Sequence, residues 1–201
     1  MEGNTPTRQD ERSAATRASL IDAGRRLFGE RGYAAVGTEE LVRAAGVTRG
    51  ALYHQFRDKA ALLEAVYETV ERELTERIAA DVLDAGAADP LAALREGARA
   101  FLDACSEPQV ERIVLLDAPA VLGWERWREI GMGHAMGIVL ATLQAGIDAG
   151  AIREQPVEPL AHLLVGAMDE MAMWVARAPD RATAREQAMG TIEGLLSALA
   201  P

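Results

Sequence analysis

Cationic side chains, hydroxyl groups and glycines lie close together in one stretch of the chain, residues 38–59, which reads TEELVRAAGVTRGALYHQFRDK. Arg49 carries a planar guanidinium that can bind both acceptors of a guanine edge, and the neighbouring Gly50 would permit close approach of the backbone. Thr48 adds a hydroxyl group beside them. A helix that begins at these residues would present them to base edges, while other side chains anchor the phosphate backbone.

The flanking residues predict the two helices that would position this group. Thr38 is a suitable N-cap for a first helix, because its hydroxyl can accept an unpaired backbone N–H, and Thr48 is one for a second. Gly46 between them can adopt the positive φ that ends a helix. The inner faces are predicted to consist of Leu41, Val42, Ala45, Ala51, Leu52 and Phe56. Two short helices joined by a glycine turn indicate a helix-turn-helix, whose second helix enters the major groove.

The segment from about Ser13 to Val70 resembles the DNA-binding domain of the TetR family of bacterial one-component transcriptional regulators. The resemblance rests on three pieces, LIDAGRRLFGERGYAAVGTEELVRAAGV, TRGALYHQF and DKAALLEAV, and the spacing from the AAGV turn to DK matches without a gap. The stretch DAPAVLGWERWREI is similar to one found in actinobacterial-type members. The rest of the chain resembles the family only in length and helical character.

This resemblance implies DNA contacts for individual residues. Base edges would be reached from the start of the second helix. Lys59, the only lysine of the chain, would meet phosphate at the positive N-terminus of the following helix. The implied set of DNA-binding residues is Thr38, Thr48, Arg49, Gly50, Tyr53, His54 and Lys59.

Two positions depart from the family pattern. Glu39 and Glu40 open the first helix of the motif, where some members place an arginine that reads a base. Acidic residues suit a helix N-terminus but not DNA, so base reading from that helix is doubtful. Gln55 replaces a residue that is often histidine or tyrosine, which leaves its role open.

Composition favours an all-α protein of about nine helices. Of the 201 residues 49% are hydrophobic, enough for a sizeable core, and alanine, leucine, glutamate and arginine dominate over β-branched and aromatic runs. We expect a flexible N-terminal arm over residues 1–11 and a helix-turn-helix DNA-binding domain over residues 12–60. Residues 61–201 are expected to form a helical ligand-binding and dimerisation domain.

Cap and break signals predict the helix bounds. The first helix is expected from about Arg12 to Glu30, before Gly32. A long amphipathic helix is expected from the N-cap Asp58 to the break at residues 86–90, so that it joins the two domains. Further helices are expected over residues 91–105, 110–116 (with a turn at 117–119), about 159–177 and about 181–199. A helical segment over 121–128 is expected to precede or merge with a long helix that ends at residue 148.

Charge is distributed unevenly along the chain. The formal net charge is −10, but residues 1–60 hold ten Lys and Arg against eight Asp and Glu, whereas residues 61–201 hold eleven against twenty-three. An acidic second domain would not compete with the basic face for phosphate. The simpler interpretation of the acidic part is a solvated, soluble surface.

The sequence indicates a cytoplasmic protein without a membrane segment. Cys105 is the only cysteine, so no disulfide can form within the chain, and no signal-peptide pattern begins it. The uncharged run Ile130–Ile147 does reach membrane length. Its His134, Thr142, Gln144 and four glycines favour a buried central helix instead.

The second domain is expected, mainly from the resemblance, to contain a ligand cavity for an unknown small-molecule effector. Large, adaptable apolar side chains suit such a cavity. The candidates are Trp124, Trp127, Met132, Met136, Met168, Met171 and Trp174, with Met173 beside them. Polar contacts could come from Asp117, His134, Gln144, His162 and Asp169. The alternative is that all of these are ordinary core and dimer residues.

The last two expected helices, about 159–177 and 181–199, carry apolar residues on more than one side. In TetR-like proteins this pair forms a four-helix bundle with its mate, so the resemblance implies a homodimer suited to a palindromic double-stranded DNA operator. The expected function is a ligand-responsive repressor that a small molecule releases from its operator. Activation stays open, because it depends on where the operator lies.

Two alternative functions stay open. A helical ligand-binding or dimerisation protein without specific DNA binding would share most of these features, but Arg49, Tyr53 and Lys59 argue against it. An enzyme would need motifs that the sequence lacks, since it has no G-x-S-x-G, P-loop or Rossmann glycine pattern. The histidines at 54, 134 and 162 have no metal-ligand spacing, and neither a metal nor another cofactor is expected.

Overall fold

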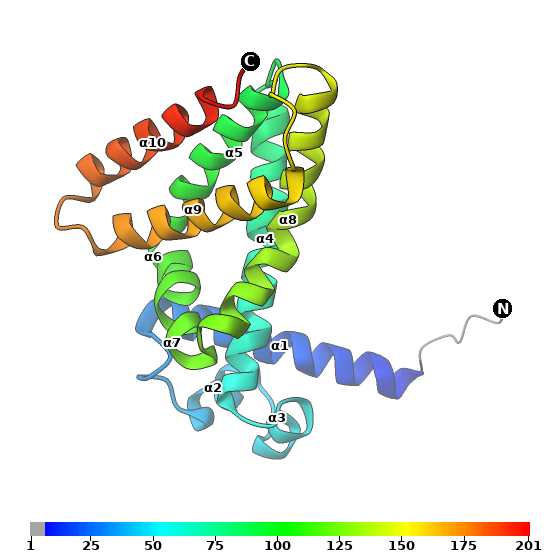
Figure 1. Cartoon of the computed structure of the whole chain (residues 1–201). Coiled ribbons are helices and arrows are strands. Elements are labelled where there is room, and N and C mark those ends of the chain that lie inside the picture. Colours follow the sequence, from blue (N-terminus) through cyan, green and yellow to red (C-terminus); the bar gives the residue numbers. More distant parts are fainter. Residues whose placement is uncertain (1–6) are drawn as a thin grey trace.

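The computed structural model describes residues 7–201, which fold into helices with no strand among them. Figure 1 shows three helices at one end of the molecule and a larger helical body at the other, with the long helix α4 running between them. The predicted all-α fold is confirmed.

Helix α1 (Arg8–Arg31) begins earlier than the predicted Arg12, because Thr7 and Asp10 form a capping box. The backbone N–H of Thr7 donates to the Asp10 carboxylate over 2.9 Å, and that of Asp10 donates to the Thr7 hydroxyl over 3.3 Å. Residues 8–11 are therefore helix rather than flexible arm, and residues 1–6 of that predicted arm lie outside the described residues. The helix ends at Gly32, whose φ of 83° favours glycine.

Helices α2 (Thr38–Ala45) and α3 (Arg49–Gln55) form the predicted helix-turn-helix. The prediction that Thr38 caps α2 is wrong: Gly37 is the N-cap, without a side-chain hydrogen bond, because Thr38 is already the first helical residue. The other two signals are confirmed. Gly46 takes the left-handed conformation with φ 67°, and the Thr48 hydroxyl accepts a hydrogen bond from the backbone N–H of Ala51 over 3.1 Å.

Helix α4 (Lys59–Asp84) starts at the predicted cap, since the Asp58 carboxylate accepts a hydrogen bond from the backbone N–H of Ala61 over 2.7 Å. It packs against α1 at one end and against α5 and α8 in the body (Figure 1). Its fully buried residues include Leu62, Leu63, Val66 and Tyr67. The expected domain boundary near residue 60 therefore lies at the start of a helix that belongs to both parts.

The first half of the body consists of α5 (Pro90–Cys105), α6 (Pro108–Val110), the π-helix η1 (Glu111–Asp117), α7 (Ala118–Leu122) and α8 (Trp124–Asp148). The predicted turn at residues 117–119 is wrong, because helical backbone continues from Pro108 to Leu122. Pro119 lies within this run, directly after the step from η1 to α7, so the helical backbone passes through it without a turn.

The chain ends with α9 (Val157–Arg177) and α10 (Arg181–Ser197), drawn orange and red in Figure 1. These bounds lie within two residues of the predicted ones. Helix α9 packs against α8, α10 packs against α5, and the two helices contact each other. Leu163 and Trp174 of α9 stay largely exposed, so this pair presents an apolar outer face.

Candidate nucleic-acid interface and effector cavity

Helix α3 presents a polar, exposed face. Thr48, Arg49, Gly50, Tyr53 and His54 are all exposed to solvent, and Leu52 on the opposite side is fully buried. Since Leu52 holds the helix to the core, its outer residues are free to meet a flat or grooved partner. Five of the seven predicted DNA-binding residues thus share one surface.

Arg49 is pre-oriented on this face. Its Nη1 lies 2.9 Å from the Glu39 carboxylate of α2, and its guanidinium lies 5.6 Å from the centroid of the Tyr53 ring. Hydrogen bonding to Tyr53 and the charge of Glu39 raise the pKa of Arg49, so it remains a cation. The unexpected acid Glu39 therefore positions the guanidinium, and a base or phosphate would have to replace it.

Lys59 occupies a half-buried site. Its Nζ donates to the backbone carbonyls of Tyr33 and Val36, both over 2.9 Å, and lies 3.9 Å from the centroid of the Tyr33 ring. Burial lowers the pKa of Lys59, which the charge of Asp117 partly opposes. The side chain fastens the α1–α2 loop to α4, and one N–H is left for a phosphate. Thr38 is likewise half-buried.

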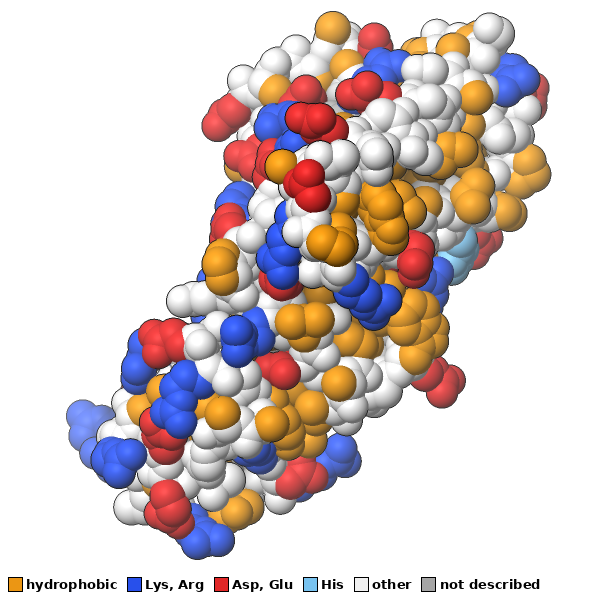
Figure 2. Space-filling view, turned by 90° about the vertical axis from the view of Figure 1, so that its left-hand side faces the viewer, with side chains coloured by type: hydrophobic (Ala, Val, Ile, Leu, Met, Phe, Trp, Pro, Cys, Tyr) orange, Lys and Arg blue, Asp and Glu red, His pale blue; other side chains and the backbone are white. Residues whose placement is uncertain are grey.

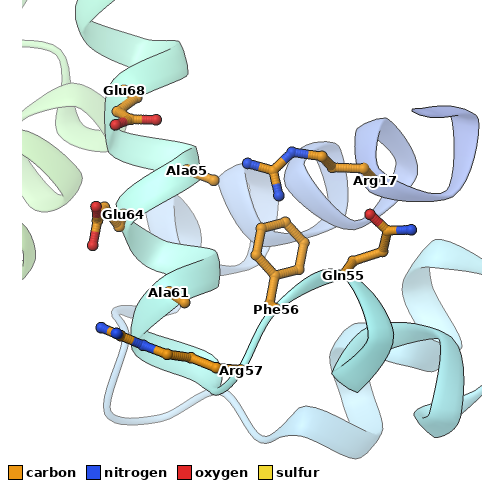
Figure 3. Close-up of a pocket in the computed structure, with 8 residues that line it drawn as sticks. All are labelled: Arg17, Gln55, Phe56, Arg57, Ala61, Glu64, Ala65 and Glu68. Carbon is orange, nitrogen blue, oxygen red and sulfur yellow. The ribbon is translucent and has the colours of Figure 1, made fainter. Parts of the chain in front are cut away.

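Gln55, whose role the sequence left open, joins α3 to α1: its Nε2 donates to the Ser13 hydroxyl over 2.7 Å. It also borders a small open pocket of about 350 Å³ at the junction of α1, α3 and α4. Figure 3 shows Arg17 extended over the Phe56 ring in this pocket, with the guanidinium 4.5 Å from the centroid. Glu64 and Glu68 of α4 form its other side (Figure 3).

Glu64 and Glu68 also form ion pairs with a side chain of the body. Arg126 of α8 lies 2.6 Å from the Glu64 carboxylate and 3.4 Å from that of Glu68. A second link joins the α1–α2 loop to η1, where the backbone N–H of Tyr33 donates to the Asp117 carboxylate over 2.7 Å. Polar contacts therefore connect the body to both sides of the helix-turn-helix.

Charge differs between the two ends of the molecule. Figure 2 shows Lys and Arg side chains gathered toward the lower end, with acidic side chains among them, and hydrophobic side chains in patches over the body. The lower end in this view is that of α1–α3, since the turn from Figure 1 is about the vertical axis. Cations and the exposed face of α3 are thus at the same end.

The body contains a cavity of about 420 Å³ between α4, α5, α8, α9 and α10. Its volume is within the range of small-molecule sites. Almost the whole lining is apolar, from residues such as Leu74, Ile78, Phe101 and Val139. The charged residues in the lining are Glu71 of α4 and Asp169 of α9. The expected cavity therefore has a counterpart in the structure, although its lining differs from the expected one.

Of the seven apolar ligand-binding candidates, the structure places only Met168 in this lining. Trp127 is 2% exposed and donates through Nε1 to the Val114 carbonyl over 2.8 Å, so it is a core residue. Trp124 and Trp174 are 54% and 42% exposed. Met171 packs against the main core.

The remaining candidates are also elsewhere. Met136 packs against a second apolar cluster around Leu143, and Met132 is half-buried outside the lining. Among the polar candidates only Asp169 borders the cavity. Asp117 binds the Tyr33 N–H, Gln144 donates to Asp148 over 2.8 Å, His162 is exposed, and His134 is half-buried.

Glu71 lines the cavity but was not among the residues predicted there from the sequence. It is 8% exposed, and burial raises the pKa of Glu71 to about 7, an effect to which the charge of Asp169 adds. A signal was present, since Glu71 follows Tyr67 by four and precedes Leu74 by three, inside the apolar stripe of α4.

Asp169 has a cationic neighbour. Its carboxylate lies 3.8 Å from Nη1 of Arg128 on α8. Burial raises the pKa of Asp169 to about 6, and the Arg128 charge opposes that rise. Tyr67 beside them donates from its hydroxyl to the Trp127 carbonyl over 3.1 Å. The acidic end of the cavity is therefore held by α4, α8 and α9 together.

By length and composition alone, helix α8 is long and apolar enough to cross a membrane. In the structure, 17% of its most apolar 18-residue segment is buried. Its residues Gly131, Ala135, Ile138, Val139 and Thr142 line the cavity. The prediction of a buried central helix is therefore wrong, because most of this apolar run is not buried and only part of it lines the cavity.

Comparison with known proteins matches both parts of the chain. A family model described as bacterial regulatory proteins, tetR family, matches residues 20–66, and one described as tetracyclin repressor-like, C-terminal domain, matches residues 91–199. A crystal structure of a TetR-family transcriptional regulator from Pectobacterium atrosepticum is 36% identical. It covers 97% of this chain and 98% of its own, with a TM-score of 0.84.

Two curated relatives show the same relationship. The Transposon Tn10 TetC protein of Escherichia coli is 27% identical over 191 residues, which is 95% of each chain. An HTH-type transcriptional repressor of Mycobacterium tuberculosis, Rv1474c, is 43% identical over 75 residues, 37% of this chain and 38% of its own.

Proposed function

The chain belongs to the TetR family of bacterial regulatory proteins, and we propose that it is a repressor that binds a palindromic operator as a homodimer and leaves it when a small molecule occupies the cavity. A ligand-responsive, DNA-binding transcriptional regulator is the function shared by this family. Its place of action would be the cytoplasm.

The observation that carries the DNA-binding half is the exposed face of α3. Arg49, held by Glu39 and lying near Tyr53, has the shape and charge to bind a guanine edge. Tyr53 and His54 follow on the same face and are proposed to contact phosphate. Lys59 keeps one free N–H at the N-terminus of α4, where the helix dipole also favours an anion.

The dimer is proposed to form through α9 and α10. Leu163, at 61% exposure, and Trp174 give α9 an apolar outer face, which favours burial against a second copy. An isologous contact would place two α3 helices on one side, and a palindromic operator requires their separation to match one turn of DNA, about 34–36 Å.

Release is proposed to act through α4. This helix lines the cavity at Glu71 and carries Glu64, which Arg126 of α8 holds, only seven residues away. A ligand that moves α8 against α4 would therefore change the angle of the helix-turn-helix. A hundredfold loss of operator affinity requires a coupling of about 2.7 kcal/mol between the two sites.

Fluorescence anisotropy on the duplex upstream of the protein's own gene tests this function, beside a shuffled duplex of the same composition. We expect tighter binding to the native duplex and a log-linear loss of affinity with salt. Equal affinity for both duplexes would argue against a regulator of its own gene. A selection of bound genomic fragments would then separate a distant operator from a protein that does not read DNA.

A further inference from the structure

We infer that the cavity takes an apolar amine, an organic cation whose charged end lies beside Glu71 and Asp169 and whose hydrocarbon body extends along α4. Only the role of this amine as the effector that releases DNA rests on the proposed function. Binding itself would be a property of the free protein.

The body of the ligand follows from the shape of the lining. The cavity extends along α4 from Glu71, which is 8% exposed, to Leu83, which is 79% exposed. Twelve residues of helix span about 18 Å. Ile138 and Leu195 also line the cavity and are about half exposed, so they mark an apolar rim. A bound ligand would therefore be exposed to solvent at the rim and buried at Glu71.

The charged end follows from an imbalance between buried acids and bases. Glu71 and Asp169 both face the cavity, and Arg128 lies 3.8 Å from Asp169 without belonging to the lining. One guanidinium can balance one carboxylate, which leaves Glu71 without a cation. Because an unpaired buried charge is costly, a ligand ammonium group would supply the missing partner.

The backbone of α8 comes close to the acidic end of the cavity at Gly131. Gly131 of α8 borders the cavity there, and a Cβ on it would lie 3.2 Å from the Tyr67 hydroxyl and 3.9 Å from the Glu71 carboxylate. Any larger residue would crowd the acidic end. Glycine at this position therefore lets α8 pack closely against Tyr67 and Glu71, and a side chain here would narrow the acidic end of the cavity.

The same lining disfavours anions. Among the described residues that line the cavity there is no lysine, arginine or histidine. A fatty acid or another carboxylate would bring a third negative charge to Glu71 and Asp169. A neutral alcohol would fit the apolar part but would leave the imbalance at Glu71 unchanged.

Three probes of equal chain length separate these cases: n-octylamine, 1-octanol and octanoate, titrated by calorimetry into the full-length protein without DNA at pH 8. We expect the amine to bind at least about tenfold more tightly than the alcohol, the gain typical of a charge-assisted hydrogen bond. Octanoate should bind most weakly. Equal affinities, or tightest binding of octanoate, would overturn the inference.

Variants locate the charged end. Glu71→Gln should reduce the affinity for octylamine to that for octanol and leave octanol binding unchanged, and Asp169→Asn should weaken the amine as a second, independent test. Glu76→Gln, which changes an exposed acid on the same helix, is the matched control and should behave as the wild type. An unchanged amine preference in both cavity variants would place the amine elsewhere.

Lower pH should weaken the amine selectively. The ionisable groups around Glu71 are Tyr67 on its own helix, Asp169 on α9 with Arg128 of α8, and Cys105 on α5. As pH falls from 8 to 5.5 the two carboxyls gain protons, so amine affinity should fall while octanol affinity stays constant. A pH-independent amine affinity would count against carboxylate pairing.

These results are independent of the operator assay. Loss of amine selectivity in a protein that still binds its operator would remove this inference and leave the regulator. Retained selectivity in a protein that distinguishes no DNA would leave the cavity and remove the proposed function.

Discussion

The Arg126 guanidinium lies 2.6 Å from the Glu64 carboxylate, so that the start of α8 is tied to the second turn of α4. The pair stands between the cavity and the helix-turn-helix. Its position gives α8 a direct means of changing the orientation of α4, because the contact joins two long helices rather than two loops.

Arg126→Ala is expected to change operator affinity severalfold although Arg126 is far from α3, because α4 loses one of its anchors. The effect on unfolding should be small, about 0.2–1 kcal/mol, since the pair is partly exposed. A double-mutant cycle with Glu64→Gln, measured by both operator anisotropy and urea unfolding, separates the two effects. Arg72→Ala, which removes a surface pair with Glu76, is the control; equal operator affinity in all variants would exclude the coupling role.

Arg49→Ala should reduce sequence preference, whereas Tyr53→Ala should reduce the affinity for all DNA sequences. Loss of Arg49 should cost about 1–3 kcal/mol on the preferred operator and relax preference at one base pair, because it removes a base contact. Loss of Tyr53 should weaken all sequences alike. Anisotropy on the native duplex and on single-base variants measures both. Arg99→Ala, an exposed arginine of α5, controls for net charge, and a uniform loss for Arg49→Ala would contradict base reading.

Glu71→Gln should stabilise the protein at pH 8 and not at pH 4.5. The pKa of Glu71 is about 7 in the folded protein against 4.5 for an ordinary Glu, so the folded state holds this proton more tightly. The ionised carboxylate therefore destabilises the fold fully above pH 7, and this cost disappears as pH falls to 4.5. The gain at pH 8 would be up to about 3 kcal/mol.

Thermal unfolding across that pH range checks this prediction, with Glu76→Gln as the reference. A melting temperature raised equally at both pH values would mean that packing, rather than ionisation, limits stability at Glu71.

Leu163→Glu with Trp174→Glu should convert the proposed dimer to monomer, because two charges would replace exposed apolar side chains on α9. Sedimentation velocity measures the mass, and operator affinity should fall by more than tenfold, since one half-site contact is lost. Leu116→Glu, at an exposed position on η1 away from the cavity lining, is the control. An unchanged mass would place the interface on another face.

The helix-turn-helix could be predicted from sequence because its signals are local. Gly46 and Thr48 act within four residues, and Asp58 caps α4 in the same way, so each role depends on the backbone nearby. The wrong predictions of helix bounds arose where two local signals compete. Thr7 and Asp10 cap α1 earlier than the apolar stripe indicated, and Pro119 lies inside continuous helical backbone rather than in a turn.

The cavity could be expected but not located, because an open volume is a property of several helices at once. Large side chains such as Trp127 fill space, and it is buried in the core. Small ones create space, as Gly97 and Gly131 do along the lining. Which small residues face a common centre depends on helix rotation and crossing, which no single segment of sequence specifies.

Lys59 is the only side-chain amine in the protein, and its hydrogen bonds to the Tyr33 and Val36 carbonyls have a practical consequence. A reagent that acylates lysine has a single side chain to modify. It can react only when the α1–α2 loop moves and the hydrogen bonds from Lys59 break. The rate of that one modification would therefore time the opening of the loop, and bound DNA or bound ligand would each change the rate without any engineered label.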